Sequence, residues 1–237
     1  MPKHDALILD LHSAIDRLLD RLDDLRFYLI GADTLAQQDA KRWGFASLEA
    51  RGAAVVGASA ELEAATRTFI QRTHDELNGM TIPIKDIRPS LRQLAAHSEF
   101  ESLRTTNDHS KLWERRSYTT TMDSCANPLK LPIVRKTAQP PLDGRTLRPE
   151  HFFRLWDVYG LPGVAFPSVA WVGSLQKIAL ARNDIAHGNL RFKDIFLQPG
   201  RNAREIERYL DDLSLFAIHL VEQWEEYLEK ELYLAGP

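Results

Sequence analysis

The chain has 237 residues, of which 44% are hydrophobic, and it carries a net charge of −3 and a single cysteine, Cys125. This size and composition indicate a globular protein of one large or two small domains, and one cysteine excludes an intrachain disulfide or a thiolate zinc cluster. No apolar run approaches the roughly 18 residues of a membrane span, and the acids among the first leucines argue against a signal peptide. We therefore expect a cytoplasmic protein with no membrane partner.

The first hundred residues predict three helices. Apolar residues at spacings of three and four, from Leu7 to Leu29, predict a long amphipathic helix that ends near Gly31. A second helix is expected over about residues 47–77, and its Ala- and Gly-rich middle allows a neighbouring helix to come close. Pro89 suits the first turn of a third, shorter helix that runs to about Leu103.

An irregular insertion is expected at about residues 105–148. It contains four prolines and a run of threonines at 119–121, and it has no sustained helical period. Short strands are expected near SYTTTM (117–122) and LPIVRK (131–136). The insertion separates the early helices from the late ones.

The last ninety residues return to helical patterns. Pro149 begins a short helix, PEHFFRLWDVYG, and Ser168 is expected to cap a helix that runs to Ala186 and stops at Gly188. A final helix is expected over about residues 203–232. Its apolar seam is Ile206, Leu210, Leu213, Ala217, Leu220, Trp224 and Tyr227. The chain is thus predicted to be a single all-α bundle over residues 1–237.

Charge is unevenly distributed along this bundle. Residues 111–148 hold eight Lys or Arg against three acids, a local charge of +5, and residues 203–231 hold three basic residues against nine acids, a local charge of −6. RNA would favour the first region and avoid the second. The candidate RNA-binding residues are Arg115, Arg116, Lys130, Arg135 and Lys136. The alternative is that these side chains form a solvated loop.

The stretch ARNDIAHGN (181–189) places Arg182, Asn183 and His187 at the end of the helix before Gly188. Arg182 falls on a predicted apolar stripe with Val172, Leu175, Ala179 and Ala186, where it needs an acid, an anion or an interface. Arg182 and His187 are five residues apart, about 140° of rotation and about 7.5 Å of rise on a regular helix. Two copies that face each other across a two-fold axis bring such groups together more easily than one copy does.

These residue types suit the cleavage of RNA by its own 2′-hydroxyl. An imidazole in the last turn of a helix is stabilised in its protonated form by the helix dipole, as a general acid or base near neutral pH requires. An arginine supplies a fixed positive fork for a phosphate. The product would be a 2′,3′-cyclic phosphate, and the reaction calls for no metal or cofactor.

The stretch ARNDIAHG resembles the R-N-x-x-x-H signature of HEPN domains, the helical higher eukaryote and prokaryote nucleotide-binding class. The helical layout is similar to that of the bacterial HEPN-like nucleases of the RiboL-PSP-HEPN and MAE types. The resemblance implies a HEPN-like bundle and a metal-independent endoribonuclease of toxin–antitoxin or phage-defence systems. It also implies a homodimer in which the two motifs line a shared cleft.

By this resemblance Arg182, Asn183 and His187 are the active-site residues, with Asn183 positioning Arg182 or the phosphate. RNA and an antitoxin or another regulatory protein are the expected partners. One alternative is a non-catalytic HEPN module that binds nucleotide, RNA or a protein, and another is a purely structural helical protein. In the structural alternative Arg182 and His187 cap the helix end and form a buried salt bridge, and Asn183 braces the loop after Gly188.

Overall fold

The computed structural model describes residues 4–105, 108, 110, 112, 122–133, 140–188 and 191–236. Within these residues 75% are helical and no β-strand is formed, so the predicted all-α fold is confirmed. The longer helices are α1 (Asp5–Gln38), α2 (Ala40–Gly79), α7 (Val169–His187) and α9 (Ala203–Glu229). The shorter ones are α3 (Pro89–Ala95), α4 (His97–Thr105), α6 (Pro149–Leu155) and α8 (Phe192–Ile195). No described helix combines the length and the apolar composition that a membrane crossing demands.

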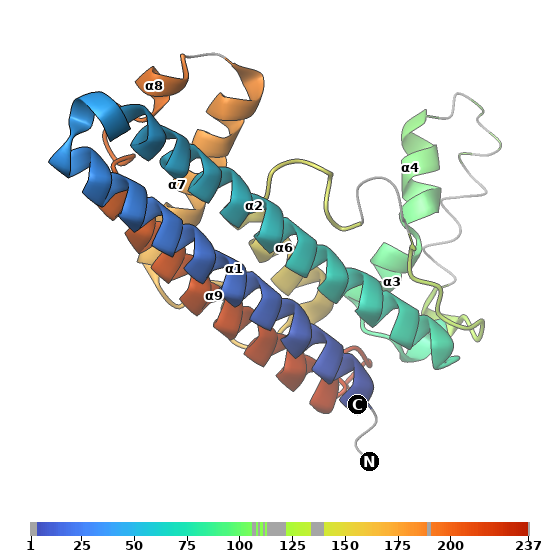
Figure 1. Cartoon of the computed structure of the whole chain (residues 1–237). Helices are drawn as coiled ribbons and strands as arrows, with labels where there is room; N and C mark the ends of the chain where they lie inside the picture. The colour runs from blue at the N-terminus through green and yellow to red at the C-terminus, as the bar shows by residue number, and fades with distance from the viewer. Residues whose placement is uncertain are drawn as a thin grey trace.

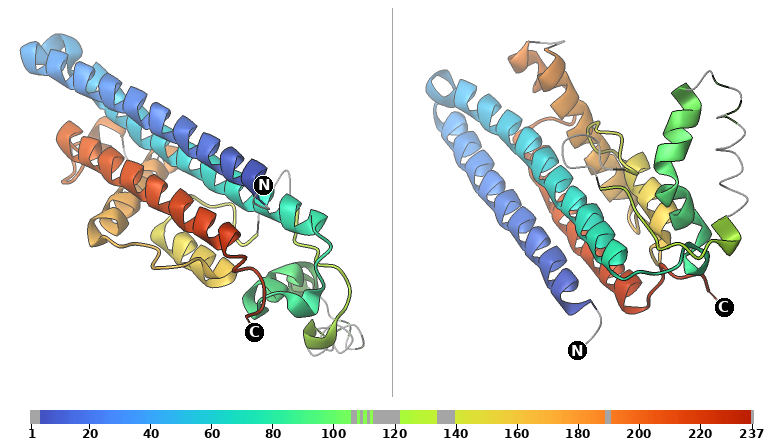
Figure 2. Two further views of the ribbon diagram at one scale, coloured as in Figure 1. Left: turned by 90° about the horizontal axis from the view of Figure 1, so that it is seen from below. Right: turned by 90° about the vertical axis from the view of Figure 1, so that its right-hand side faces the viewer.

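Three long helices form the body of the molecule. Figures 1 and 2 show α1, α2 and α9 side by side, with α6 and α7 packed against them. One continuous hydrophobic core joins these elements, from Leu7 in α1 to Tyr233 after α9. The core also includes Leu142 and Leu147, so the last part of the predicted insertion is packed into the same core as the helices.

The hairpin of α1 and α2 forms because both helices bury one apolar face against the other. The leucine stripe from Leu7 to Leu29 is buried, as its spacing predicted. A Cβ atom added at Gly57 would lie 2.9 Å from Leu25 Cδ1, so α1 packs so closely on α2 there that a larger residue would displace the Leu25 side chain. The prediction that small residues in α2 allow close packing is confirmed.

The predicted C-terminus of the first helix and the predicted N-terminus of the second are wrong. The first helix passes through Gly31 and ends at Gln38, and the second begins at Ala40 instead of near Ser47. The extra turns are held by a contact between the helices, because Arg51 Nη2 lies 2.8 Å from Asp33 Oδ1. Asp39 then caps α2 by accepting a hydrogen bond from the backbone N–H of Arg42.

The C-terminal helix α9 completes the core. Asn202 caps it by accepting from the backbone N–H of Glu205 at 2.9 Å, and α9 ends at Glu229. Every residue of the predicted seam is buried. Because the seam faces α1, α2 and α7, it is part of the core and not an exposed surface for a second copy.

The predicted third helix is broken into α3 and α4 at Ala96, where a ψ of 13° interrupts the helical hydrogen bonding. The helix predicted from Pro149 is confirmed as α6, but it continues from Trp156 to Gly160 as a π-helical turn, η3. This turn packs against α3.

Residues 122–133 and 140–148 of the insertion are irregular, whereas residues 110 and 112 are helical. A short 3-10 turn spans Met122–Ser124, and the expected strand near 131–136 is absent from residues 131–133, the part of it that the structure describes. The other expected strand lies, apart from Met122, outside the described residues. Asn78 of α2 holds this segment through two hydrogen bonds to the backbone of Leu131.

Candidate active site

The helix that carries the motif has the predicted boundaries. Ser168 Oγ accepts a hydrogen bond from the backbone N–H of Ala170 at 3.2 Å, which caps the start of α7. Gly188 ends the helix with a φ of 61°, a left-handed conformation that favours glycine. The N-cap and C-cap predicted from the sequence are therefore confirmed.

The buried face of α7 is rotated from the predicted stripe. The buried residues of α7 are Ser174, Leu175, Ile178, Ala179 and Ala181. Ala186 is exposed and Val172 is half-buried, so the predicted stripe is wrong at both positions. The rotation leaves Arg182 half-buried at the edge of the core instead of inside it.

All three motif residues line one pocket of about 620 Å³, here called the motif pocket. Its other walls come from α2, α6 and residues 140–148, here called the strap. Besides Arg182, Asn183 and His187, the pocket is lined by Glu63, Asp143, Gly144, Arg145, Thr146, Arg148, Glu150, His151 and Arg154. Arg182 and His187 thus border the same space despite their five-residue separation.

Arg182 forms no hydrogen bond or ion pair with any residue that the structure describes. The neighbouring acid on the helix, Asp184, is engaged by another residue, because Arg201 Nη2 lies 2.6 Å from Asp184 Oδ2. A half-buried guanidinium without a counter-ion is unfavourable unless it meets an anion. The predicted alternative of a buried salt bridge to Arg182 is not found among the described residues.

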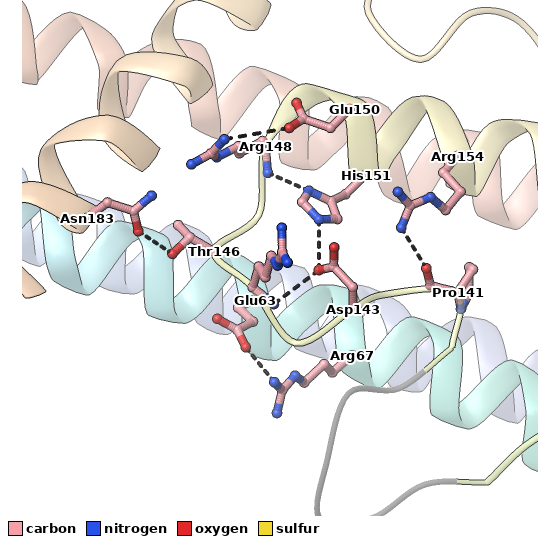
Figure 3. A network of polar contacts seen from close by, with 11 residues as sticks. Glu63, Arg67, Pro141, Asp143, Thr146, Arg148, Glu150, His151, Arg154 and Asn183 are labelled. Atoms are coloured by element: carbon pink, nitrogen blue, oxygen red, sulfur yellow. Dashed lines mark hydrogen bonds and ion pairs between the residues drawn. The ribbon is translucent and has the colours of Figure 1, made fainter. Parts of the chain in front are cut away.

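Asn183 connects the motif helix to the strap. Thr146 Oγ1 donates a hydrogen bond of 2.7 Å to Asn183 Oδ1, as Figure 3 shows. Asn183 therefore braces the strap, which precedes α6, and not the loop after Gly188 that the structural alternative named. The amide nitrogen of Asn183 has no partner among the described residues.

A second histidine fixes the other end of the strap (Figure 3). His151 is buried, its Nδ1 accepts from the backbone N–H of Arg148 at 3.0 Å, and its Nε2 lies 3.1 Å from Asp143 Oδ1. The backbone bond makes Nδ1 the acceptor, so Nε2 carries the proton and donates it to Asp143. With both nitrogens engaged, His151 is a positioning residue.

The environment of Asp143 favours its charged form. Partial burial alone would raise the pKa of this carboxyl, but hydrogen bonds from the backbone N–H of Arg145 and from His151, with the charge of nearby Arg154, hold its pKa below the usual value. The carboxylate is thus kept ionised and bonded at neutral pH, which stabilises the turn of the strap.

The pocket gathers arginines that the sequence pattern did not assign to a site. Arg145, Arg148 and Arg154 join Arg182 at its wall. Arg145 and Arg148 belong to the basic region already counted between residues 111 and 148. The excess of positive charge in that region could therefore have identified them as site residues. Arg154 lies beyond that region, on α6, and only the fold brings it to the pocket.

Of the five predicted RNA-binding residues, the structure describes only Lys130, and Lys130 does not line the motif pocket. Lys130 is exposed, and it adjoins Leu131, which is bonded to Asn78 near the end of α2. Glu63, the α2 residue of the motif pocket, lies 15 positions earlier, about 22 Å along a helix. The structure therefore does not bring Lys130 to the motif. The other four residues, Arg115, Arg116, Arg135 and Lys136, lie outside the described residues.

Chemically, the pocket offers cations and hydrogen-bond donors to an anion, with an exposed imidazole at its edge. Across the described ranges, no group of three or more His, Cys, Asp or Glu side chains is arranged to hold a metal ion. No protein-family model, curated protein or solved structure matches this chain.

Proposed function

We propose that the protein is a metal-independent endoribonuclease of the HEPN type, with the motif pocket as its active site. The observation that supports this proposal is that Arg182 and His187 line one polar pocket. Neither side chain forms a hydrogen bond or an ion pair with another described residue. An unpaired arginine and an exposed histidine that line the same pocket are suited to bind a phosphodiester and to transfer protons at it.

In the proposed reaction the ribose 2′-oxygen attacks the adjacent phosphorus and the bond from phosphorus to the 5′-oxygen breaks. His187 acts as the general base that takes the 2′ proton, or as the general acid that protonates the leaving 5′-oxygen. Arg182 stabilises the additional negative charge on the pentavalent phosphate. The products are a 2′,3′-cyclic phosphate and a free 5′-hydroxyl, so the reaction requires neither an oxidant nor a metal ion.

Asn183 is assigned a double role in this proposal. Its oxygen holds the strap through Thr146, and its amide N–H groups are positioned at the pocket to donate to a phosphate oxygen. The two arginines of the strap, Arg145 and Arg148, supply further positive charge for the RNA backbone.

The oligomeric state and the biological role rest on the resemblance of ARNDIAHG to the HEPN signature. We propose a homodimer that brings two motif helices to a common cleft, because one copy carries only one exposed motif imidazole, and the reaction needs both a base and an acid. A toxin or phage-defence role, restrained by an antitoxin or another regulatory protein, follows from the same resemblance.

The test is cleavage of a mixed-sequence RNA in EDTA, with wild type beside Arg182→Ala and His187→Ala. Matched controls are Lys177→Ala, an exposed cation on the same helix, and His12→Ala, a half-buried histidine on α1 that contacts Glu225 and lies outside the motif pocket. We expect wild type and both controls to leave fragments that end in 2′,3′-cyclic phosphate, and both motif variants to lose at least a hundredfold in rate.

Two results would count against the proposal. Cleavage that survives in both folded motif variants would place the activity elsewhere. A folded protein that binds RNA and cuts none, with or without added divalent metal, would favour the non-catalytic binding module.

A further inference from the structure

A second pocket adjoins the motif pocket on the other side of the strap. It has a volume of about 680 Å³ and is bordered by α3, α4, the strap and the π-helical turn η3. Asp143 and Arg154 line both pockets, so the two spaces are neighbours that share one wall. Either volume is large enough for one nucleotide.

The shared wall is held in place at several points. Arg154 Nη1 donates to the backbone oxygen of Pro141 at 3.1 Å, His151 is bonded to Asp143, and Thr146 is bonded to Asn183 (Figure 3). These bonds tie the strap to α6 and to α7. A ligand therefore meets two preformed compartments instead of one deformable groove.

The two compartments differ in charge. The motif pocket has four arginines against three carboxylates. Among its lining residues the second pocket has one arginine, Arg154, and one histidine, His97, against three carboxylates, which are Glu101, Asp143 and Asp157. A phosphate would be repelled from the second pocket and attracted to the first. The second pocket also has an apolar wall that contains the buried side chains of Leu94 and Leu142. An apolar wall with carboxylate acceptors suits an aromatic ring that has flat apolar faces and N–H groups at its edge.

The position of Asp157 is set by the π-helical turn. The carbonyl of Val158 accepts a hydrogen bond from Ser90 Oγ at 2.8 Å, and Arg88 Nη1 donates to the carbonyls of Tyr159 and Gly160. These bonds fix the backbone on the C-terminal side of Asp157. Asp157 itself is exposed and has no bond to another described residue, so its oxygens are available as acceptors. Single π-helical turns are frequent at functional sites.

We propose that the second pocket binds the base next to the scissile phosphate and selects adenine and cytosine, which have an exocyclic amino group at C6 or C4, over uracil. The amino group donates to the Asp157 carboxylate, as the amino group of cytosine does when a carboxylate recognises it, and the amino group of adenine offers the same N–H donor. Uracil presents a carbonyl at that position and is repelled. This inference rests on the proposed function, because it deepens the description of the same site.

The test measures binding without cleavage. Fluorescent 2′-O-methyl hexanucleotides of A, C or U are titrated in EDTA, since the methyl group blocks attack by the 2′-oxygen. We expect the A and C hexamers to bind about tenfold more tightly than the U hexamer. Asp157→Ala should bring the three affinities together, and Asp16→Ala, a change to an exposed acid on α1, should leave the preference intact.

Arg182→Ala separates this inference from the function on which it rests. We expect this variant to weaken all three hexamers by a similar factor, because it acts on the phosphate. Asp157→Asn, which keeps the side-chain shape, gives a second variant if Asp157→Ala fails to fold. Equal affinities for all hexamers in wild type, with binding still lost in Arg182→Ala, would overturn base selection alone. No binding of any hexamer and no RNA cleavage would overturn both.

Discussion

Replacing Arg182 by methionine should remove activity and leave the fold as stable as before, or more stable. Methionine keeps an apolar stem at the edge of the core, and it removes a half-buried guanidinium that has no counter-ion among the described residues. A fully buried, unpaired ion costs several kcal/mol, and for a half-buried one we discount this to about 0.5–1 kcal/mol. For a chain of this length that gain corresponds to a Tm about 1–4 °C higher.

Arg201→Met is the matched control, because Arg201 is the paired arginine next to the same helix. Its side chain is 11% exposed and contacts Asp184 at 2.6 Å. Loss of this partner leaves Asp184 unpaired and should lower the free energy of unfolding by about 1–3 kcal/mol. The Tm should then fall by about 2–12 °C, a change opposite in sign to that of Arg182→Met.

The assay is thermal unfolding followed by circular dichroism, beside RNA cleavage in EDTA. A fall in Tm for Arg182→Met as large as that for Arg201→Met would show that Arg182 forms a structural ion pair. The argument that Arg182 is kept unpaired for a phosphate would then be refuted.

Three further predictions concern the fold around the site. Burial lowers the pKa of His74 to about 4, so between about pH 6.5 and 4 the unfolded chain binds one proton more than the folded chain. The free energy of unfolding should therefore fall by about 3 kcal/mol as the pH drops through this range. His74→Asn should remove that pH dependence in urea titrations. In a double-mutant cycle, Thr146→Val and Asn183→Ala should show a coupling of about 1 kcal/mol in stability, and a coupling near zero would mean that the strap is not held there. Gly160→Ala should lower the free energy of unfolding by more than about 3 kcal/mol in denaturant melts. The added Cβ would lie 1.5 Å from Arg88 Nη1, and the φ of 65° disfavours alanine. A smaller loss would show that the Arg88 side chain can move aside.

Local chemistry made the helices predictable. The caps at Ser168 and Gly188 and the buried seam of α9 follow from the residues themselves and their spacing. The continuation of α1 beyond Gly31 was not predictable in this way, because it depends on a contact between Asp33 and Arg51, which belong to different helices. Glycine weakens a helix by about 1 kcal/mol, and a tertiary contact of this kind offsets such a preference.

The site was predictable only where it is continuous in the sequence. Arg182, Asn183 and His187 were identified as a group from six consecutive residues, and the structure places them at one pocket. The strap and α6 were missed as walls of that pocket, because the bond from Thr146 to Asn183 joins residues 37 positions apart. The half-burial of Arg182 was also misjudged, since a small rotation of α7 about its axis moves a residue from the core to its edge.

The anchored strap ties one wall of the motif pocket to helices that follow it in the sequence. Pro141, Asp143 and Thr146 each bond to an element that follows them in sequence, on α6 or α7. A change in the chain just before residue 140 therefore reaches the strap side of the motif pocket by displacing one of these three bonded points. Insertions or substitutions in residues 106–139 are therefore expected to leave the positions of Arg182, Asn183 and His187 unchanged, because the three bonds hold the strap against α6 and α7.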